Sequence, residues 1–264
     1  MLKLEFAERT SPGKIRGNNE DAVAHVVPEA EAQTRGYLFC IADGMGAHAH
    51  GEVASKLAVE TTCSEFRSGP KGVMHVSLLP RIVQAANIAV YDAGHGRVSN
   101  GSNMGSTLVV CALRFDSAVV SHVGDSRCYL FRAGTLTQLT HDHTMRNEHM
   151  RLGILSSADA GSEESNSILT RALGLELFVA ADTITVNVVV GDLLMLCTDG
   201  LHGYVPEATI RALMTSPQGP DHIADSLISA AHDAGAPDNV SVQLIRILSV
   251  ERMGLYRGRP YRLL

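Results

Sequence analysis

The stretch TLVVCALRFDSAVVSHVGDSRCYLFRAGTLTQLT, residues 107–140, consists of four apolar runs separated by short polar connections. The runs TLVVCAL, AVVSHVGD, CYLFRAG and LTQLT have the length of β-strands. Connections such as 114–117 and 132–134 suit a hairpin and are far too short for the helical crossover that parallel strands need. This stretch therefore predicts consecutive antiparallel strands.

The rest of the chain adds further strands and a few amphipathic helices. Strand patterns recur at 2–10, 23–27, 37–43, 183–190, 192–199 and 240–248. The pair at 183–199 looks like a hairpin with its turn at Gly191. Helical spacing of apolar residues predicts helices over 51–66, from Pro80 onward, over 206–214 and over 221–233. Strands outnumber helices, which excludes a doubly wound parallel sheet and favours an α+β sandwich with helices covering antiparallel sheets.

The composition is that of a chain that buries a large core and is not built to coat nucleic acid. Its 264 residues are 45% hydrophobic, with a net charge of −6 and a pI near 6.0. We expect one domain over residues 1–248, followed by a basic tail over 249–264. The default interpretation of the tail is a frayed terminus, and docking to an acidic partner is the alternative.

Two features predict a cytoplasmic location. No run approaches the roughly 20 apolar residues of a membrane span, and the N-terminal MLKLEFAERT lacks the apolar core of a signal peptide. The five cysteines are an odd number without a C-x-x-C pair, and we interpret them as small core residues in a reducing compartment.

Acidic residues stand at the ends of several predicted strands. Asp43 and Asp199 each precede a glycine, Asp125 follows SHVG, and Asp238 comes just before the last strand. A single Asp-Gly is a common turn dipeptide, so each acid alone is better explained as a turn residue. The set is different, because carboxylates that meet at one edge of a sandwich repel each other unless a divalent cation joins them. Carboxylate and carbonyl oxygens favour Mg²⁺ or Mn²⁺ over Zn²⁺.

Seven strings carry a specific family resemblance. In order over residues 9–248 they are RGNNEDA, ADGMGAHAHGEVAS, GSTLVV, VGDSRCYLFRAGTLTQLTHDHT, ILTRALG, LLMLCTDGL and PDNVSV. Together they resemble the metal-dependent PPM-type (type 2C) serine/threonine protein phosphatases, especially the compact bacterial members. One such motif is weak evidence, but seven in order are specific. The resemblance implies a four-layer αββα fold, in which two antiparallel sheets are flanked by helices on both sides.

The resemblance also implies a set of metal ligands. Asp43 matches the aspartate that bridges two Mn²⁺ or Mg²⁺ ions, and Gly44 matches the glycine whose carbonyl binds one of them. Asp199 and Asp238 match the remaining ligands of the second ion. Asp125 matches a position that helps to hold a third, weaker ion in bacterial relatives.

Three further residues match the family's substrate and water sites. Glu20 and Asp21 match acids that steer metal-bound waters, and Arg16 matches the arginine that binds the substrate phosphate. Two such cations lower the pKa of a bridging water, orient it for in-line attack on phosphorus and neutralise charge on the departing oxygens. An arginine suits bidentate phosphate binding, although Arg16 without its acidic neighbours would be taken for a solvated turn residue.

The chain departs from the family pattern at two positions. Met45 replaces a histidine that many eukaryotic relatives use to protonate the leaving group, and a thioether has no proton to give. A metal-bound water is the expected acid, with His48 and His50 as weaker alternatives. Ala47 replaces a second glycine, at a cost of about 1 kcal/mol if the site requires positive φ.

Two other features have more than one interpretation. The pairs His48/His50 and His141/His143 are better explained as exposed polar histidines than as metal ligands. Residues 145–168, with a short helix at 145–153, fall where the family has a mobile flap, or form an ordinary surface excursion.

The sequence predicts an enzyme that hydrolyses phosphoserine and phosphothreonine in proteins, as a monomer that opposes a Ser/Thr kinase. A non-catalytic phosphoprotein-binding regulator is one alternative, and the complete set of expected ligands speaks against it. A metallohydrolase of small phosphate esters or nucleotides is another. The absence of Trp and the 5% aromatic content make nucleotide stacking less favourable.

Overall fold

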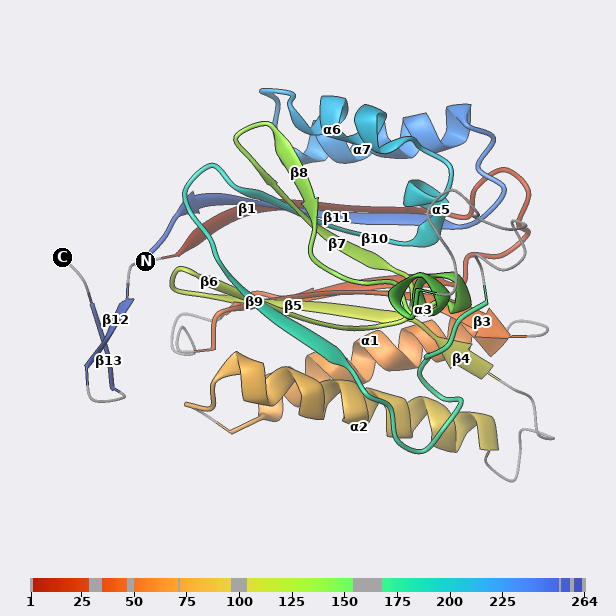
Figure 1. The fold of residues 1–264 in the computed structure, drawn as a ribbon, viewed down its shortest axis with the longest axis horizontal. Helices are drawn as coiled ribbons and strands as arrows, with labels where there is room; N and C mark the ends of the chain where they lie inside the picture. Colours follow the sequence, from red (N-terminus) through yellow and green to blue (C-terminus); the bar gives the residue numbers. More distant parts are fainter. Residues whose placement is uncertain are drawn as a thin grey trace.

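The computed structural model describes residues 2–28, 35–46, 50–70, 72–95, 104–153, 168–251, 253–256 and 259–262. They form two antiparallel sheets packed between two layers of helices (Figure 1). This four-layer αββα arrangement confirms the predicted fold class. The loop after β1, the short helix α5 and the far end of β3 lie at the end of the sandwich away from the termini.

The first sheet has five strands, in the spatial order β1 (Lys3–Ser11), β11 (Val240–Ser249), β10 (Leu193–Cys197), β7 (Arg127–Arg132) and β8 (Thr135–Gln138). The second has the order β2 (Asp21–Val26), β3 (Tyr37–Gly46), β5 (Leu108–Arg114), β6 (Ser117–Val123) and β9 (Asp182–Asn187), with β4 (Met104–Ser106) pairing with the end of β3.

The helices cover the outer faces of the two sheets. Over the six-stranded sheet lie α1 (His50–Ser68) and α2 (His75–His95), and over the five-stranded sheet lie α6 (Glu207–Met214) and α7 (Pro220–Asp233) (Figure 1). Two shorter helices, α3 (Met145–Arg151) and α5 (Asp199–His202), lie near the end of the sandwich that carries the acids.

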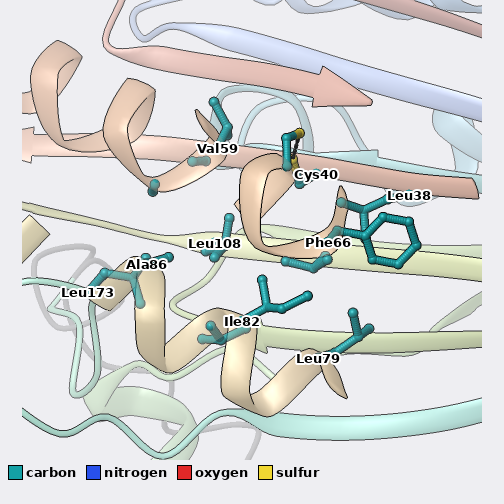
Figure 2. Packing of buried hydrophobic residues seen from close by; sticks show 14 of the residues in the cluster. Leu38, Cys40, Val59, Phe66, Leu79, Ile82, Ala86, Leu108 and Leu173 are labelled. Carbon is teal, nitrogen blue, oxygen red and sulfur yellow. Dashed lines mark hydrogen bonds between the residues drawn. The ribbon is translucent and has the colours of Figure 1, made fainter. Parts of the chain in front are cut away.

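The uninterrupted apolar run of β3 follows from burial on both of its faces. Phe39 and Ile41 face the core between the sheets, whereas Leu38 and Cys40 pack against α1 and α2 (Figure 2). Successive side chains of a strand point to opposite faces, so a strand in the middle of four layers is apolar at every position. All five cysteines are free and buried, which confirms their interpretation as core residues.

Two predicted hairpins are wrong. The strands β6 and β7 belong to different sheets, and so do β9 and β10. The connections Gly124–Ser126 and Val188–Asp192 therefore cross from one sheet to the other. Sheets stack about 10 Å apart, a distance that a connection of hairpin length can span.

Smaller differences concern element ends. The helix α2 begins at His75, so Pro80 lies inside it. The predicted tail carries a separate two-stranded sheet, β12 (Met253–Tyr256) with β13 (Arg259–Arg262), in place of a frayed end. In the described part of the chain, no helix has the length and apolar character needed to cross a membrane.

Candidate active site

Four aspartates from both sheets mark one end of the sandwich. Asp43 lies near the end of β3, and Asp21, the first residue of β2, lies directly opposite it in the ladder. Asp199 is the first residue of α5, and Asp238 stands just before β11 in the other sheet. Two of these acids thus lie on the six-stranded sheet, and the other two flank strands β10 and β11 of the five-stranded sheet.

The electrostatics of these side chains show that they act on one another. Burial raises the pKa of Asp43 well above its usual range, and the negative charges of Asp21 and Asp199 raise it further. Burial also raises the pKa of Asp21 to about 7 and that of Asp125 to about 7, and the charge of Asp199 adds to both shifts. The pKa of Asp199 itself is raised by burial and then by the charge of Asp238. Without a cation, these carboxylates oppose each other's ionisation.

Two buried carboxylate oxygens have no hydrogen-bond partner among the described residues. They are Asp21 Oδ1 and Asp199 Oδ1. A buried polar atom without a partner is costly, and a cation placed among these acids would supply one. A donor set made of carboxylates, without cysteine or histidine, suits Mg²⁺ or Mn²⁺. The residues present therefore fit a divalent metal centre.

Close packing requires glycine at the positions that follow Asp43 and Asp199. A Cβ at Gly44 would lie 1.9 Å from the carbonyl oxygen of Gly51 in α1, and a Cβ at Gly200 would lie 1.9 Å from the carbonyl oxygen of Asn239. A Cβ at Gly51 would in turn lie 2.7 Å from the Gly44 carbonyl oxygen and 2.8 Å from Glu20 Oε2. The first turn of α1 thus brings the Gly44 carbonyl and the Glu20 carboxylate to the same place.

Arg16 reaches the acids from the loop between β1 and β2. Its Nη2 donates to Asp238 Oδ2 at 2.9 Å, and its side chain is 55% exposed. An arginine that is held at one side by a carboxylate and is open to solvent at the other can bind an incoming anion. The structure therefore brings together Arg16 and the acids that the sequence predicted.

Comparison with known proteins agrees with this geometry. The model of the protein phosphatase 2C family matches residues 16–248. The chain belongs to the protein phosphatase 2C family. The serine/threonine phosphatase Stp of Listeria innocua is 34% identical over 262 residues, which cover 98% of this chain and 99% of the relative.

Solved structures of the protein phosphatase 2C family have the same fold. The catalytic domain of the serine/threonine protein phosphatase PstP, solved with two manganese ions, is 32% identical with a TM-score of 0.80, over 94% of this chain and 100% of that one. Stp1 from Staphylococcus aureus is 29% identical with a TM-score of 0.83, over 94% and 95% of the two chains.

Several residues that orient this protein phosphatase 2C site were not singled out from the sequence. Asn239 accepts a hydrogen bond from the Glu20 backbone N–H at 2.8 Å and donates to the backbone oxygens of Pro12 and Asn18 at 3.1 and 2.8 Å. It therefore fastens the loop that carries Arg16 and Glu20 beside Asp238. The triplet PDN, residues 237–239, was the available signal for Asn239, but it does not say which groups Asn239 hydrogen-bonds to.

Two threonines orient the acids in the same way. The Thr198 hydroxyl donates to Asp21 Oδ2 at 2.9 Å and accepts from the Ser241 backbone N–H at 3.0 Å. The Thr107 hydroxyl accepts from the Asp43 backbone N–H at 2.9 Å. Thr107 directly precedes β5 and Thr198 directly precedes α5, and both lie within the motif strings. Their hydrogen bonds, however, join segments that are distant in the sequence.

The interpretation of His143 as exposed is wrong. Its side chain is buried beside His122 and Asp182, with Nε2 at 3.3 Å from Asp182 Oδ2. Its Nδ1 accepts from the Gly124 backbone N–H, so the neutral ring carries its proton on Nε2. Arg171 Nη1 donates to Asp182 Oδ1 at 2.9 Å. The negative charge of Asp182 is thus paired with Arg171, so this network needs no metal ion.

His141 is exposed, as predicted. The predictions about Ala47 and His48 lie outside the described residues, as does most of the predicted flap, residues 154–167. The described start of that segment forms α3, which confirms the predicted short helix.

Proposed function

We propose that the acidic end of this sandwich is the catalytic centre of a metal-dependent protein serine/threonine phosphatase. The enzyme class follows from membership of the protein phosphatase 2C family. The observation that supports the location is the convergence of Asp43, Asp199 and Asp238 at one end of the two sheets. Beside them, one buried carboxylate oxygen of Asp21 and one of Asp199 have no hydrogen-bond partner among the described residues.

In this proposal Asp43, Gly44, Asp199 and Asp238 hold two Mn²⁺ or Mg²⁺ ions, and Asp125 helps to hold a weaker third. The two ions that the PstP structure contains support this assignment. Bound ions of this kind acidify a water nucleophile and neutralise charge on a phosphoryl group.

The remaining residues orient the reactants. Arg16 binds the phosphate dianion of the substrate, because its guanidinium is exposed and is already held beside the acids by Asp238. Glu20 and Asp21 orient ordered waters. Asp21 is fixed for this task by the Thr198 hydroxyl, and Glu20 by the Asn239 side chain. Met45 supplies no proton, so the leaving group takes its proton from solvent within the site.

The substrates in this proposal are proteins phosphorylated by a serine/threonine kinase, and the enzyme acts in the cytoplasm as a monomer. Hydrolysis of a phosphothreonine peptide, compared with nucleoside monophosphates, separates this function from that of a small-ester hydrolase. Equal or faster nucleotide hydrolysis would overturn the assignment of substrate class.

The decisive experiment removes one ligand. We expect Asp199→Asn to lower phosphopeptide turnover with saturating Mn²⁺ by at least about 100-fold, because the negative charge of Asp199 holds the ions on which catalysis depends. Asp233→Asn, at an exposed position of α7, is the matched control and should leave turnover unchanged. Circular dichroism checks that both variants fold. Near-normal turnover of folded Asp199→Asn would show that Asp199 is not part of the site. A wild type without activity would contradict the proposed function.

A further inference from the structure

We propose that His202 is a positioning residue that fixes the turn at residues 124–126, the Asp125 turn, against the helix carrying Asp199, and thereby sets the affinity for the weaker third ion that Asp125 helps to hold. This inference rests on the proposed function, because it assigns Asp125 to metal binding. It concerns a side chain that the motif strings gave no reason to select.

The Asp125 turn is not shaped by strand pairing. It lies on the connection between β6 and β7, which belong to different sheets, so no neighbouring strand holds it in register. Gly124 has φ of +101°, and a Cβ there would lie 2.6 Å from the Thr107 side chain. The direction of the Asp125 carboxylate therefore depends on contacts from other segments.

His202, the last residue of α5, supplies such a contact. Its Nε2 lies 3.0 Å from the backbone oxygen of Asp125. A carbonyl oxygen only accepts hydrogen bonds, so the imidazole must donate from Nε2. His202 and Asp199 stand three residues apart on α5, which places them on the same side of one helical turn. The hydrogen bond thus joins the Asp125 turn to the helix that presents Asp199.

The other side of the turn is held by His143. The Gly124 backbone N–H donates to His143 Nδ1 at 3.1 Å. One histidine therefore accepts from the backbone N–H of Gly124, and another donates to the backbone carbonyl of Asp125. His143 comes from the segment before α3, so His202 is the contact that couples the turn to α5.

The expected consequence is a change in metal affinity with the fold preserved. Partners that orient metal ligands typically contribute 10–100-fold to affinity or activity. His202→Leu removes the donor. His202→Gln keeps an amide N–H at a similar reach, so it should restore what the leucine variant loses.

The test is a Mn²⁺ titration of the full chain, stripped with chelator and free of substrate, in which the electron paramagnetic resonance signal reports unbound Mn²⁺. We expect the wild type to bind two ions tightly and one weakly. The dissociation constant of the weak class should rise about 10-fold in His202→Leu and less than about 3-fold in His202→Gln. The two tight classes should not change.

A double-mutant cycle separates positioning from general structural damage. In an Asp125→Asn background, His202→Leu should have no further effect on Mn²⁺ binding, because its target ligand is already gone. If the leucine variant does not fold, His202→Asn, whose amide is too short to reach the carbonyl, takes its place.

Three results would overturn the role of His202. They are unchanged weak binding in the leucine variant, equal weakening of all three classes, and a glutamine variant as defective as leucine. A wild type that binds no Mn²⁺ and hydrolyses no phosphopeptide would instead overturn the proposed function, and this inference with it.

Discussion

The acidic side chains that make the site useful also weaken the metal-free protein. Asp21 and Asp125 have pKa values of about 7 when buried, against about 4 in an unfolded chain. The folded protein therefore binds their protons more tightly than the unfolded chain does. The resulting contribution to the free energy of unfolding is complete below about pH 4 and is lost as the pH rises through 7.

Asp125→Asn tests this cost at a single residue. In metal-free protein at pH 8 we expect the variant to melt above the wild type, because an ionised carboxylate near Asp199 is replaced by a neutral amide. Each kcal/mol of relief raises Tm by about 2–4 °C in a chain of this size. The carboxyl is protonated in both the folded and the unfolded chain only below about pH 4, so the difference in Tm should shrink as the pH falls from 8 to 5 and vanish below about pH 4.

The measurement is calorimetry of both proteins in chelator from pH 5 to pH 8. A difference in Tm that is the same at every pH would show that the amide acts through packing and not through charge. Buried histidines such as His75, whose pKa burial lowers to about 4, also make stability depend on pH in this window, because the unfolded chain binds their protons below about pH 6.5. They are common to both proteins and cancel in the comparison.

At the scale of the element, the sequence predicted the positions of strands and helices better than it predicted which strands pair with each other. Alternating and continuous apolar runs specify where β3 or β11 lies, because burial on one or both faces leaves a local pattern. A connection of hairpin length leaves no pattern that says whether the next strand pairs or crosses to the other sheet. The Asp125 turn was therefore found as an acid after a strand, but its position on a crossing between sheets was not.

The same limit applies to the site. The acids Asp43, Asp199 and Asp238 were predictable because a carboxylate directly after or before a predicted strand is a local feature that recurs. Asn239 and Thr198 were not, because their hydrogen bonds join segments up to 227 residues apart. The contact of α1 with Gly44 was equally invisible, although the glycine itself was noted.

Gly44→Ala tests whether that contact fixes the end of β3 that carries the proposed metal ligands. An added methyl group would meet the Gly51 carbonyl oxygen, so α1 and β3 must move apart. We expect the free energy of unfolding of the metal-free protein to fall by about 1–3 kcal/mol, with a loss of turnover. Urea unfolding in chelator measures the first quantity.

Gly17→Ala is the control for this substitution. Among the described residues, no atom beyond Gly17 and its chain neighbours lies within 4 Å of a Cβ built there, and its φ is not positive. The stability of this variant should therefore stay within about 0.5 kcal/mol of wild type. If Gly44→Ala were equally neutral, the close approach of α1 would not constrain the site.

At the scale of the whole molecule, the proposed metal site joins the two sheets. Asp21 and Asp43 lie on strands of the six-stranded sheet, whereas Asp199 follows β10 and Asp238 precedes β11 of the five-stranded one. The sheets are otherwise held together by the apolar core between them. A cation shared by these acids would cross-link the layers at the end away from the termini.

Mn²⁺ should therefore stabilise both sheets at once. A ligand at 100 times its dissociation constant adds about 2.7 kcal/mol to the free energy of unfolding, which corresponds to roughly 5–10 °C in Tm at this chain length. Hydrogen exchange followed by mass spectrometry should show slower exchange in peptides covering residues 41–46 and also in those covering 197–202 and 238–242. In Asp199→Asn the rise in Tm should be much smaller, whereas Asp233→Asn should behave as wild type does. Protection confined to one sheet would mean that the acids do not share their cations, because an ion held by one sheet alone has no reason to slow opening of the other.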